Sequence, residues 1–139
     1  MRQLRFDLGV ENTFFVHVVP IIRLTHSGEY KTKAIQHSVV KLREVGISPD
    51  CLVVRTPESL DEGILKKLSL FGGLPKERIV QALDLDSIYK IPQMFHEQGL
   101  TNAIQDHLFK ERQTTDLAKR RTLCESLTSP HIQVNIAIA

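Results

Sequence analysis

The sequence predicts an α/β domain with a largely parallel sheet. Short apolar runs of strand length alternate along the chain with segments of helical period, which is the order that βα units produce. The runs are continuously apolar, as expected of strands that are covered on both faces. They are rich in Val, Ile and Phe and lie at residues 14–19, 51–54, 78–83 and 134–138.

The first two helices are marked by apolar stripes and by residues that favour helix ends. The segment 32–45 stops at Gly46, because glycine readily takes the positive φ of a helix C-terminus. The next helix is predicted to follow Thr56 as its cap, with Pro57 as its first residue. Its buried stripe is expected to comprise Leu60, Ile64, Leu68 and Phe71.

Three more helices are predicted in the second half of the chain. One opens at 86–87, is interrupted by Pro92 and is closed by Gly99. Thr101 is expected to cap the next. The last covers residues 116–127.

Both ends of the sequence suggest a segment of a longer protein. Leu4 and Leu8 share one face of a helical turn that Gly9 stops, so the chain is expected to begin inside a helix. The apolar run at 134–138 has no covering element after it. We therefore expect a domain that is truncated at both ends.

Composition limits the function classes. The chain has 139 residues, of which 42% are hydrophobic and 24% charged, so it resembles one globular domain. A net charge of +2 without a basic patch argues against nucleic acid as a partner, and no apolar run reaches the ~20 residues of a membrane helix. Cys51 and Cys124 form no CxxC motif, so they are predicted to be core residues of a cytoplasmic protein.

Several kinds of active site are absent from the sequence. The six histidines show no HxxxH or HxH spacing, so no zinc site is predicted. No GxSxG and no GxxxxGK[ST] motif occurs, which excludes a self-contained NTPase. We therefore assign no catalytic residue and no metal ligand to this chain.

The strongest local signal for a ligand lies at the start of the first long helix. Lys31 and Lys33 flank a helix N-terminus, where the macrodipole is already positive, so they disfavour the helix unless an anion is present. Free backbone amides and the side chain of Gln36 converge there, which suits a phosphate group. Two solvated lysines before a helix are the plainer alternative.

Two further places could contact a ligand. Lys67 borders the expected apolar stripe of the second helix, from which it could reach an anion or simply extend into water. The loop at 83–86 directly follows a predicted strand, and ligands of open α/β sheets lie at the carboxyl ends of strands. Asp84 in this loop could contact a nucleotide base, whereas Asp86 is more simply a helix cap.

These residues resemble one family, the CTP synthases, which are glutamine-dependent amidoligases. The likeness is collinear over the whole chain and is most specific in two strings, at 31–38 and 86–92. The matching strings are Arg2-Gln-Leu-Arg-Phe-Asp-Leu-Gly9, Phe15-Val-His17, Gly28-Glu29, Lys31-Thr-Lys33, Gln36-His-Ser38, Leu42, Gly46-Ile47, Pro49-Asp50, Asp86-Ser-Ile-Tyr-Lys-Ile-Pro92 and His96-Glu-Gln-Gly-Leu100.

The resemblance implies a Rossmann-like P-loop domain of the dethiobiotin-synthetase type. In the family, ATP phosphorylates O4 of UTP and ammonia from glutamine displaces the phosphate. By position, UTP and the inhibitor CTP are expected at Lys31, Thr32, Lys33, Ala34, Ile35, Gln36 and Lys67. ATP is expected at Arg55, Leu83, Asp84 and Leu85.

The resemblance also implies a division of the chain. Residues 1–109 match the C-terminal half of the amidoligase domain, 110–132 a linker with a helix, and 133–139 the first strand of a glutaminase domain. The complete enzyme is expected to be a homotetramer that uses ATP and Mg²⁺. At Ala34 and Ile35 the family usually has Pro and Thr, which affects the expected nucleotide contacts.

Three functions fit the sequence. The chain is either a fragment of CTP synthase that is inactive alone, or a non-catalytic module that binds pyrimidine nucleotides or contacts a complete enzyme. The third alternative is one subunit of a split ligase that a second polypeptide completes.

Overall fold

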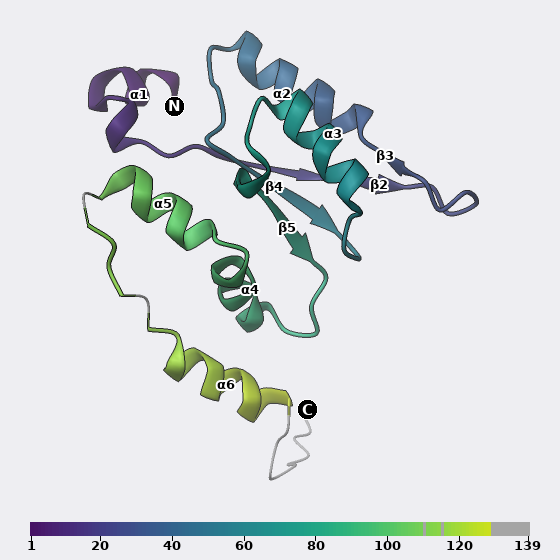
Figure 1. Ribbon diagram of the computed structural model, residues 1–139, viewed down its shortest axis with the longest axis vertical. Coiled ribbons are helices and arrows are strands. Elements are labelled where there is room, and N and C mark those ends of the chain that lie inside the picture. Colours follow the sequence, from purple (N-terminus) through teal and green to yellow (C-terminus); the bar gives the residue numbers. More distant parts are fainter. Residues whose placement is uncertain (110, 115, 129–139) are drawn as a thin grey trace, which may run out of the picture.

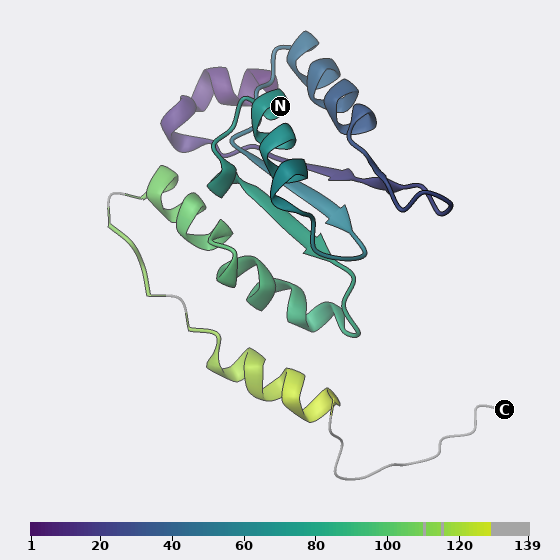
Figure 2. The same ribbon diagram turned by 45° about the vertical axis from the view of Figure 1, so that its right-hand side comes forward.

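The computed structural model describes residues 1–109, 111–114 and 116–128. It has three layers, with two helices on each face of a parallel sheet (Figures 1 and 2). The helices α2 and α3 cover one face, whereas α4 and α5 cover part of the other. The sequence-based prediction of an α/β domain with a largely parallel sheet is confirmed.

Strands and helices alternate from β3 to α4, as expected. The strands are β1 (Val16–Pro20), β2 (Ile22–Arg23), β3 (Tyr30–Lys31), β4 (Cys51–Thr56) and β5 (Ile79–Leu83). The α-helices are α1 (Arg2–Leu8), α2 (Lys33–Glu44), α3 (Glu62–Gly72), α4 (Ile91–Glu97), α5 (Leu100–Leu108) and α6 (Ala118–Thr128). Short 3₁₀ turns lie at η1 (Val10–Asn12), η2 (Lys76–Arg78) and η3 (Ile88–Lys90).

The main sheet has the strand order β1-β4-β5, and both pairs are parallel. Its register places Val18 beside Val53 and Val54 beside Gln81. Strand β4 lies in the centre and is buried along almost its whole length. The expectation that all strands are covered on both faces is wrong for β1, where Val16 and Val18 are 39% and 59% exposed.

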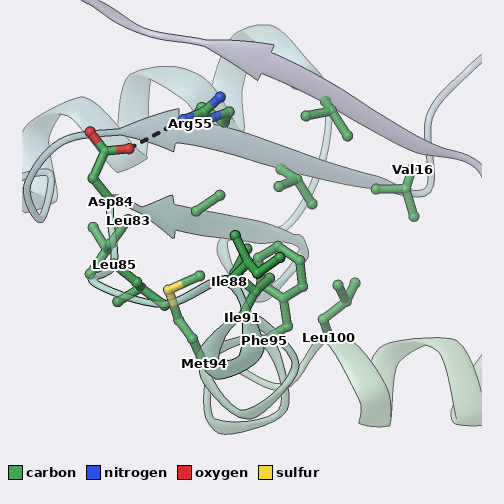
Figure 3. Close-up of a pocket in the computed structure, with 13 residues that line it drawn as sticks. Val16, Arg55, Leu83, Asp84, Leu85, Ile88, Ile91, Met94, Phe95 and Leu100 are labelled. Carbon is green, nitrogen blue, oxygen red and sulfur yellow. Dashed lines mark hydrogen bonds and ion pairs between the residues drawn. The ribbon is translucent and has the colours of Figure 1, made fainter. Parts of the chain in front are cut away.

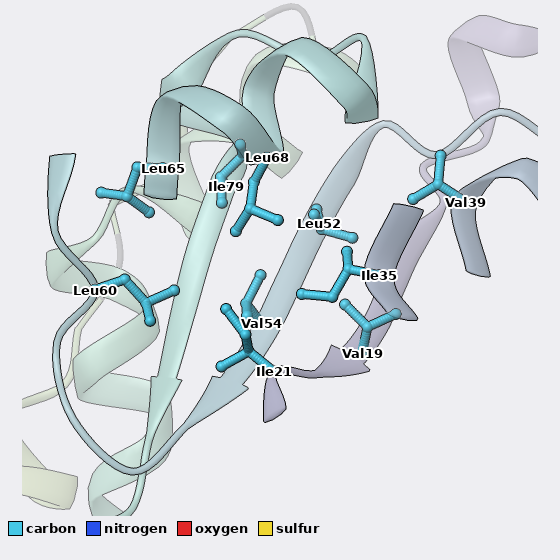
Figure 4. Packing of buried hydrophobic residues seen from close by; sticks show 10 residues of the cluster. All are labelled: Val19, Ile21, Ile35, Val39, Leu52, Val54, Leu60, Leu65, Leu68 and Ile79. Carbon is cyan, nitrogen blue, oxygen red and sulfur yellow. The ribbon is translucent and has the colours of Figure 1, made fainter. Parts of the chain in front are cut away.

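The larger part of the core lies between the sheet and the helices α2 and α3 (Figure 4). Ile35 and Val39 of α2 and Leu65 and Leu68 of α3 point toward the strands. The full buried cluster is Val19, Ile21, Ile35, Val39, Leu52, Val54, Leu60, Leu65, Leu68 and Ile79. A second, smaller cluster of Cys51, Val53, Val80 and Leu100 packs toward α5.

Helix α3 begins five residues later than the sequence suggested. Thr56 is the last residue of β4 and is buried, so it cannot serve as the helix cap. The cap is Asp61, whose carboxylate accepts a hydrogen bond from the Ile64 amide at 2.8 Å. Leu60 therefore precedes the helix. The buried leucines of α3 are Leu65 and Leu68, whereas Phe71, which was predicted to be buried, is 44% exposed.

The helices after β5 also begin differently from the prediction. Ser87, rather than Asp86, caps the turn η3 by accepting a hydrogen bond from the Tyr89 amide. Pro92 lies in the first turn of α4, where a missing N–H costs nothing, so it starts this helix instead of interrupting it. Gly99 ends α4 as expected, with φ of 85°, and itself occupies the cap position of α5 in place of Thr101.

The chain start is pinned to the sheet by Arg5. Its guanidinium donates to the Thr13 hydroxyl at 2.9 Å and to the Ser48 carbonyl at 3.1 Å, and it also pairs with the Asp50 carboxylate. It lies over the Phe15 ring as well. Helix α1 ends at Gly9 as predicted, with φ of 87°, but none of its own residues is buried.

Other predictions concern single residues and the chain end. Cys51 and Cys124 are both buried and neither forms a disulfide, as expected, and burial raises the pKa of Cys51 to about 11. Helix α6 confirms the predicted helix near 116–127. The expected strand at 134–138 lies outside the described residues. Of the described helices, none combines the length and apolar character needed to cross a membrane.

Candidate functional site

The carboxyl ends of the three parallel strands lie at the same end of the sheet. After β1 the chain forms the β2–β3 hairpin, after β4 it enters the loop at 57–61, and after β5 the loop at 84–87 (Figure 1). Parallel α/β sheets bind ligands outside the carboxyl ends of their strands, in a crevice between the loops that follow them. Every residue predicted to bind a nucleotide lies in or near these segments or on the helices that follow them.

The β2–β3 hairpin is an element that the sequence analysis missed. Ile22 pairs with Lys31 and Arg23 with Tyr30 in antiparallel register. The turn is closed by the Gly28 amide, which donates to the Leu24 carbonyl at 2.8 Å. The signal was the Ser-Gly pair at 27–28 between two strand-like stretches, and the two-residue strands are too short for hydrophobic alternation to reveal them.

The hairpin brings Lys31 and Glu29 together. The Lys31 ammonium donates to the Glu29 carboxylate at 2.8 Å. This bond lowers the pKa of Glu29, and the positive charge of Lys67 on α3 lowers it further. Two lysines that are 36 residues apart in the sequence therefore act electrostatically on one carboxylate, and Lys67 is exposed on α3.

The start of α2 adds backbone donors beside this pair. Its cap, Thr32, makes no side-chain cap bond, and the first turn of any helix leaves its amides without intrahelical partners. Lys33 and Ala34 are exposed there. The side-chain amide of Gln36 donates to the Thr32 hydroxyl at 3.1 Å. Ile35 is only 2% exposed and packs in the core, so only its backbone is accessible to a ligand.

The second group of predicted residues meets at the ends of β4 and β5. The Arg55 guanidinium pairs with the Asp84 carboxylate at 3.2 Å, and both side chains are largely exposed to solvent (Figure 3). The pair lies at one end of a cavity of about 580 Å³. Leu83 and Leu85 also line this cavity, so all four predicted ATP residues border the same space.

The cavity is largely apolar and lies over the uncovered part of the sheet. Figure 3 shows Val16 at one side, with Met94, Phe95 and Leu100 below the strands. Its size is in the range of small-molecule sites, which typically combine apolar walls with a few polar groups. A planar base between the apolar walls, with Arg55 and Asp84 at its rim, fits this arrangement.

Comparison with known proteins decides the family. A family model described as "CTP synthase N-terminus" matches residues 1–109. The chain belongs to the CTP synthase family. The match is to the N-terminal domain of these enzymes, and it does not single out the C-terminal half that the resemblance implied.

Two curated relatives, both named CTP synthase, agree with this assignment. The protein of Aeropyrum pernix is 39% identical over 118 residues, which are 85% of this chain and 22% of the relative. The protein of Thermococcus gammatolerans is 39% identical over 137 residues, which are 99% of this chain and 26% of the relative. The chain thus spans about a quarter of the length of the curated CTP synthases it matches.

The part of the CTP synthase domain described here does not fit a magnesium ion. Among residues 1–109, 111–114 and 116–128, no three His, Cys, Asp or Glu side chains gather closely enough to hold a metal. Asp84, the acidic residue at the cavity, pairs with Arg55. The predicted nucleotide residues therefore form two separate groups, one of lysines with helix amides and one of an apolar cavity with an ion pair.

Proposed function

We propose that this chain is the C-terminal half of the amidoligase domain of a CTP synthase and that it holds parts of two nucleotide sites. The parent enzyme aminates UTP to CTP at the expense of ATP, with ammonia from glutamine. The single observation that carries the proposal is that the residues of both groups follow the carboxyl ends of the parallel strands, where Lys31 pairs with Glu29 and where Arg55 and Asp84 border a cavity.

The lysine group is the proposed site for UTP and CTP. A triphosphate would replace Glu29 as the partner of Lys31 and Lys67, because it carries more negative charge than one carboxylate. The amides of the first turn of α2 would donate to the same phosphates. Thr32 and Gln36 lie at this helix start, in position to contact the nucleotide.

The cavity is the proposed site for the adenine of ATP. Leu83 and Leu85 supply apolar contacts for the ring, and Asp84 accepts hydrogen bonds from an amino group such as N6 of adenine. Arg55 holds this carboxylate in place at the rim of the cavity. No step is assigned to Mg²⁺, since the described residues hold no acidic cluster that fits it.

The remaining expectations belong to the complete enzyme. We infer that it is a cytoplasmic homotetramer in which the ligase domain is followed by a glutaminase domain, and that this chain alone does not make CTP. The division into a ligase part at 1–109, a linker at 110–132 and a glutaminase strand at 133–139 is part of the same proposal.

Chemical-shift mapping of the purified chain tests the two sites separately. UTP and CTP should each shift the backbone amide signals of residues 31–36 and 67, whereas ATP should shift those of 55 and 83–85. Inorganic triphosphate is the control, because it should affect the lysine group and leave the cavity unchanged. The proposal fails if the nucleotides shift neither group, or if all three nucleotides shift the same amides.

A further inference from the structure

The β2–β3 hairpin, which carries Lys31, has little pairing of its own. Its strands have two residues each, and a two-stranded ribbon is marginally stable in water. Residues 22–29 are all exposed, and Figure 1 shows the turn extending away from the main sheet. The position of Lys31 therefore depends on contacts between the hairpin and the rest of the domain.

Glu58, in the loop after β4, contacts both strands of this hairpin. Its Oε1 atom accepts a hydrogen bond from the Tyr30 hydroxyl on β3 at 3.0 Å. The same oxygen lies 3.3 Å from Nε of Arg23 on β2. Arg23 also lies over the Tyr30 ring, with its guanidinium carbon 5.9 Å from the ring centroid. One carboxylate thus ties both strands of the hairpin to the loop that follows the central strand.

The backbone of Glu58 is itself fixed to the main sheet. Its carbonyl accepts a hydrogen bond of 2.7 Å from the hydroxyl of Thr56, which ends β4 and is only 2% exposed. The Tyr30 ring in turn packs against the core. A line of contacts therefore runs from the buried end of β4 through Glu58 to Tyr30, the residue between Glu29 and Lys31.

We propose that Glu58 is a positioning residue for the triphosphate of the pyrimidine nucleotide. It holds the hairpin in the place from which Lys31 reaches phosphates at the start of α2. This inference rests on the proposed function. It gives a supporting role to a side chain whose own charge opposes an anion, because like charges repel. An acidic residue of this kind favours phosphate binding only by fixing the cation that makes the contact.

The sign of the effect separates positioning from electrostatic repulsion. If Glu58 acts through its charge alone, Glu58→Ala strengthens the binding of inorganic triphosphate. If Glu58 positions the hairpin, Glu58→Ala should weaken this binding about threefold to tenfold, the range expected for a lost hydrogen bond. Glu58→Gln keeps an oxygen that accepts from Tyr30 and Arg23. We therefore expect Glu58→Gln to bind triphosphate at least as tightly as the unchanged chain.

Two further variants complete the calorimetric titration with inorganic triphosphate. Tyr30→Phe removes the hydroxyl that donates to Glu58 and changes no charge, so a loss of affinity cannot be electrostatic. Glu44→Ala is the matched control. The Glu44 side chain is 54% exposed, as is that of Glu58, and it pairs with Lys41 at the far end of α2. We expect Tyr30→Phe to weaken binding and Glu44→Ala not to weaken it.

A double-variant cycle tests whether Glu58 acts through Lys31. In a chain that already carries Lys31→Ala, Glu58→Ala should cause no further loss of affinity, whereas independent effects would add. Hydrogen exchange reports on the hairpin itself. The Leu24 amide, which donates to the Glu29 carbonyl at 2.9 Å, should exchange about tenfold faster in Glu58→Ala. An unchanged Val53 amide in the central strand shows that the domain is folded.

Several results would overturn the proposal. These are undiminished triphosphate binding by Glu58→Ala, equal losses for Glu58→Ala and Glu58→Gln, an equal loss for Glu44→Ala, or the same effect of Glu58→Ala with and without Lys31. In each case triphosphate still shifts the amide signals of residues 31–36 in the unchanged chain, so the proposed function stands. If triphosphate shifts none of these signals, the proposed function fails and the binding role of Glu58 fails with it.

Discussion

At the scale of single residues, Glu29 determines how the lysine group behaves. Its carboxylate is largely exposed and bonded to Lys31, and its pKa is lowered because both lysines favour its charged form. An incoming phosphate therefore exchanges one ion pair for others. The affinity of the lysine group for a nucleotide therefore depends on how many charged contacts the nucleotide makes in excess of those that Glu29 already makes.

The two lysines should contribute to pyrimidine nucleotide binding while their neighbour does not. Lys31→Ala and Lys67→Ala are each expected to weaken UTP and CTP by about 1–3 kcal/mol, the cost of losing a charge-assisted contact. Lys66→Ala is the control, because of these two neighbours it is Lys67 whose charge lowers the pKa of Glu29. Calorimetric titration measures the change, and equal losses at positions 66 and 67 would show that the lysine group is wrongly placed.

His17 should make the stability of the chain depend on pH. Its Nε2 atom lies 2.8 Å from the Ser38 hydroxyl between β1 and α2, and burial lowers its pKa below 6.5. The unfolded chain then binds a proton at a higher pH than the folded chain, so the free energy of unfolding should fall as the pH drops below 6.5. Urea unfolding between pH 5 and 8 measures this, and His17→Gln should reduce the slope below pH 6.5.

The sequence predicted the charged members of the site but not their arrangement. Lys31, Lys67 and Asp84 were found because their positions at helix starts and strand ends are local features. The charge of Lys67 on Glu29 acts between elements far apart in the sequence, which no local spacing reveals. Ile35 illustrates the opposite error, because its place in the matching segment suggested a ligand contact although its side chain is buried in the core.

At the scale of elements, long segments were predicted well and their starts were not. Helix α2 and strand β4 lie within two residues of their predicted bounds because a full apolar stripe or run defines them. At the start of α3 two caps compete, and Thr56 is excluded because it continues β4 beside Leu83 of the neighbouring strand. Asp61 then becomes the cap, which only the sheet register could decide.

The cover of β5 by Gln98 should be worth measurable stability. Gln98→Ala removes two hydrogen bonds of 2.7 Å and leaves a backbone N–H and C=O of Gln81 without their partner. We expect a loss of about 1–3 kcal/mol in the free energy of unfolding, measured by urea denaturation. Gln93→Ala on α4, which Gln98 directly follows, is the control, since the Gln93 side chain bonds to the exposed Glu97 side chain. A loss of the same size there would contradict the role of Gln98.

At the scale of the whole molecule, the sheet has one covered edge and one open edge. Gln98 covers the β5 edge at Gln81, and Val16 and Val18 of β1, at the other edge of the described sheet, line the cavity with the proposed ATP residues. A nucleotide bound in this cavity would remain exposed on the side of Val16 and Val18.

The purified chain should make no CTP from UTP, ATP, Mg²⁺ and either glutamine or ammonia. Phosphoryl transfer depends on a loop that surrounds the phosphates and on metal ions that neutralise their charge. The sequence has no GxxxxGK[ST] motif, and the described residues contain no cluster of metal ligands. Chromatographic detection of CTP measures the outcome, with the Thermococcus gammatolerans enzyme as the positive control. CTP formed by the pure chain from ammonia would mean that it contains a complete ligase site, because ammonia bypasses any need for a glutaminase.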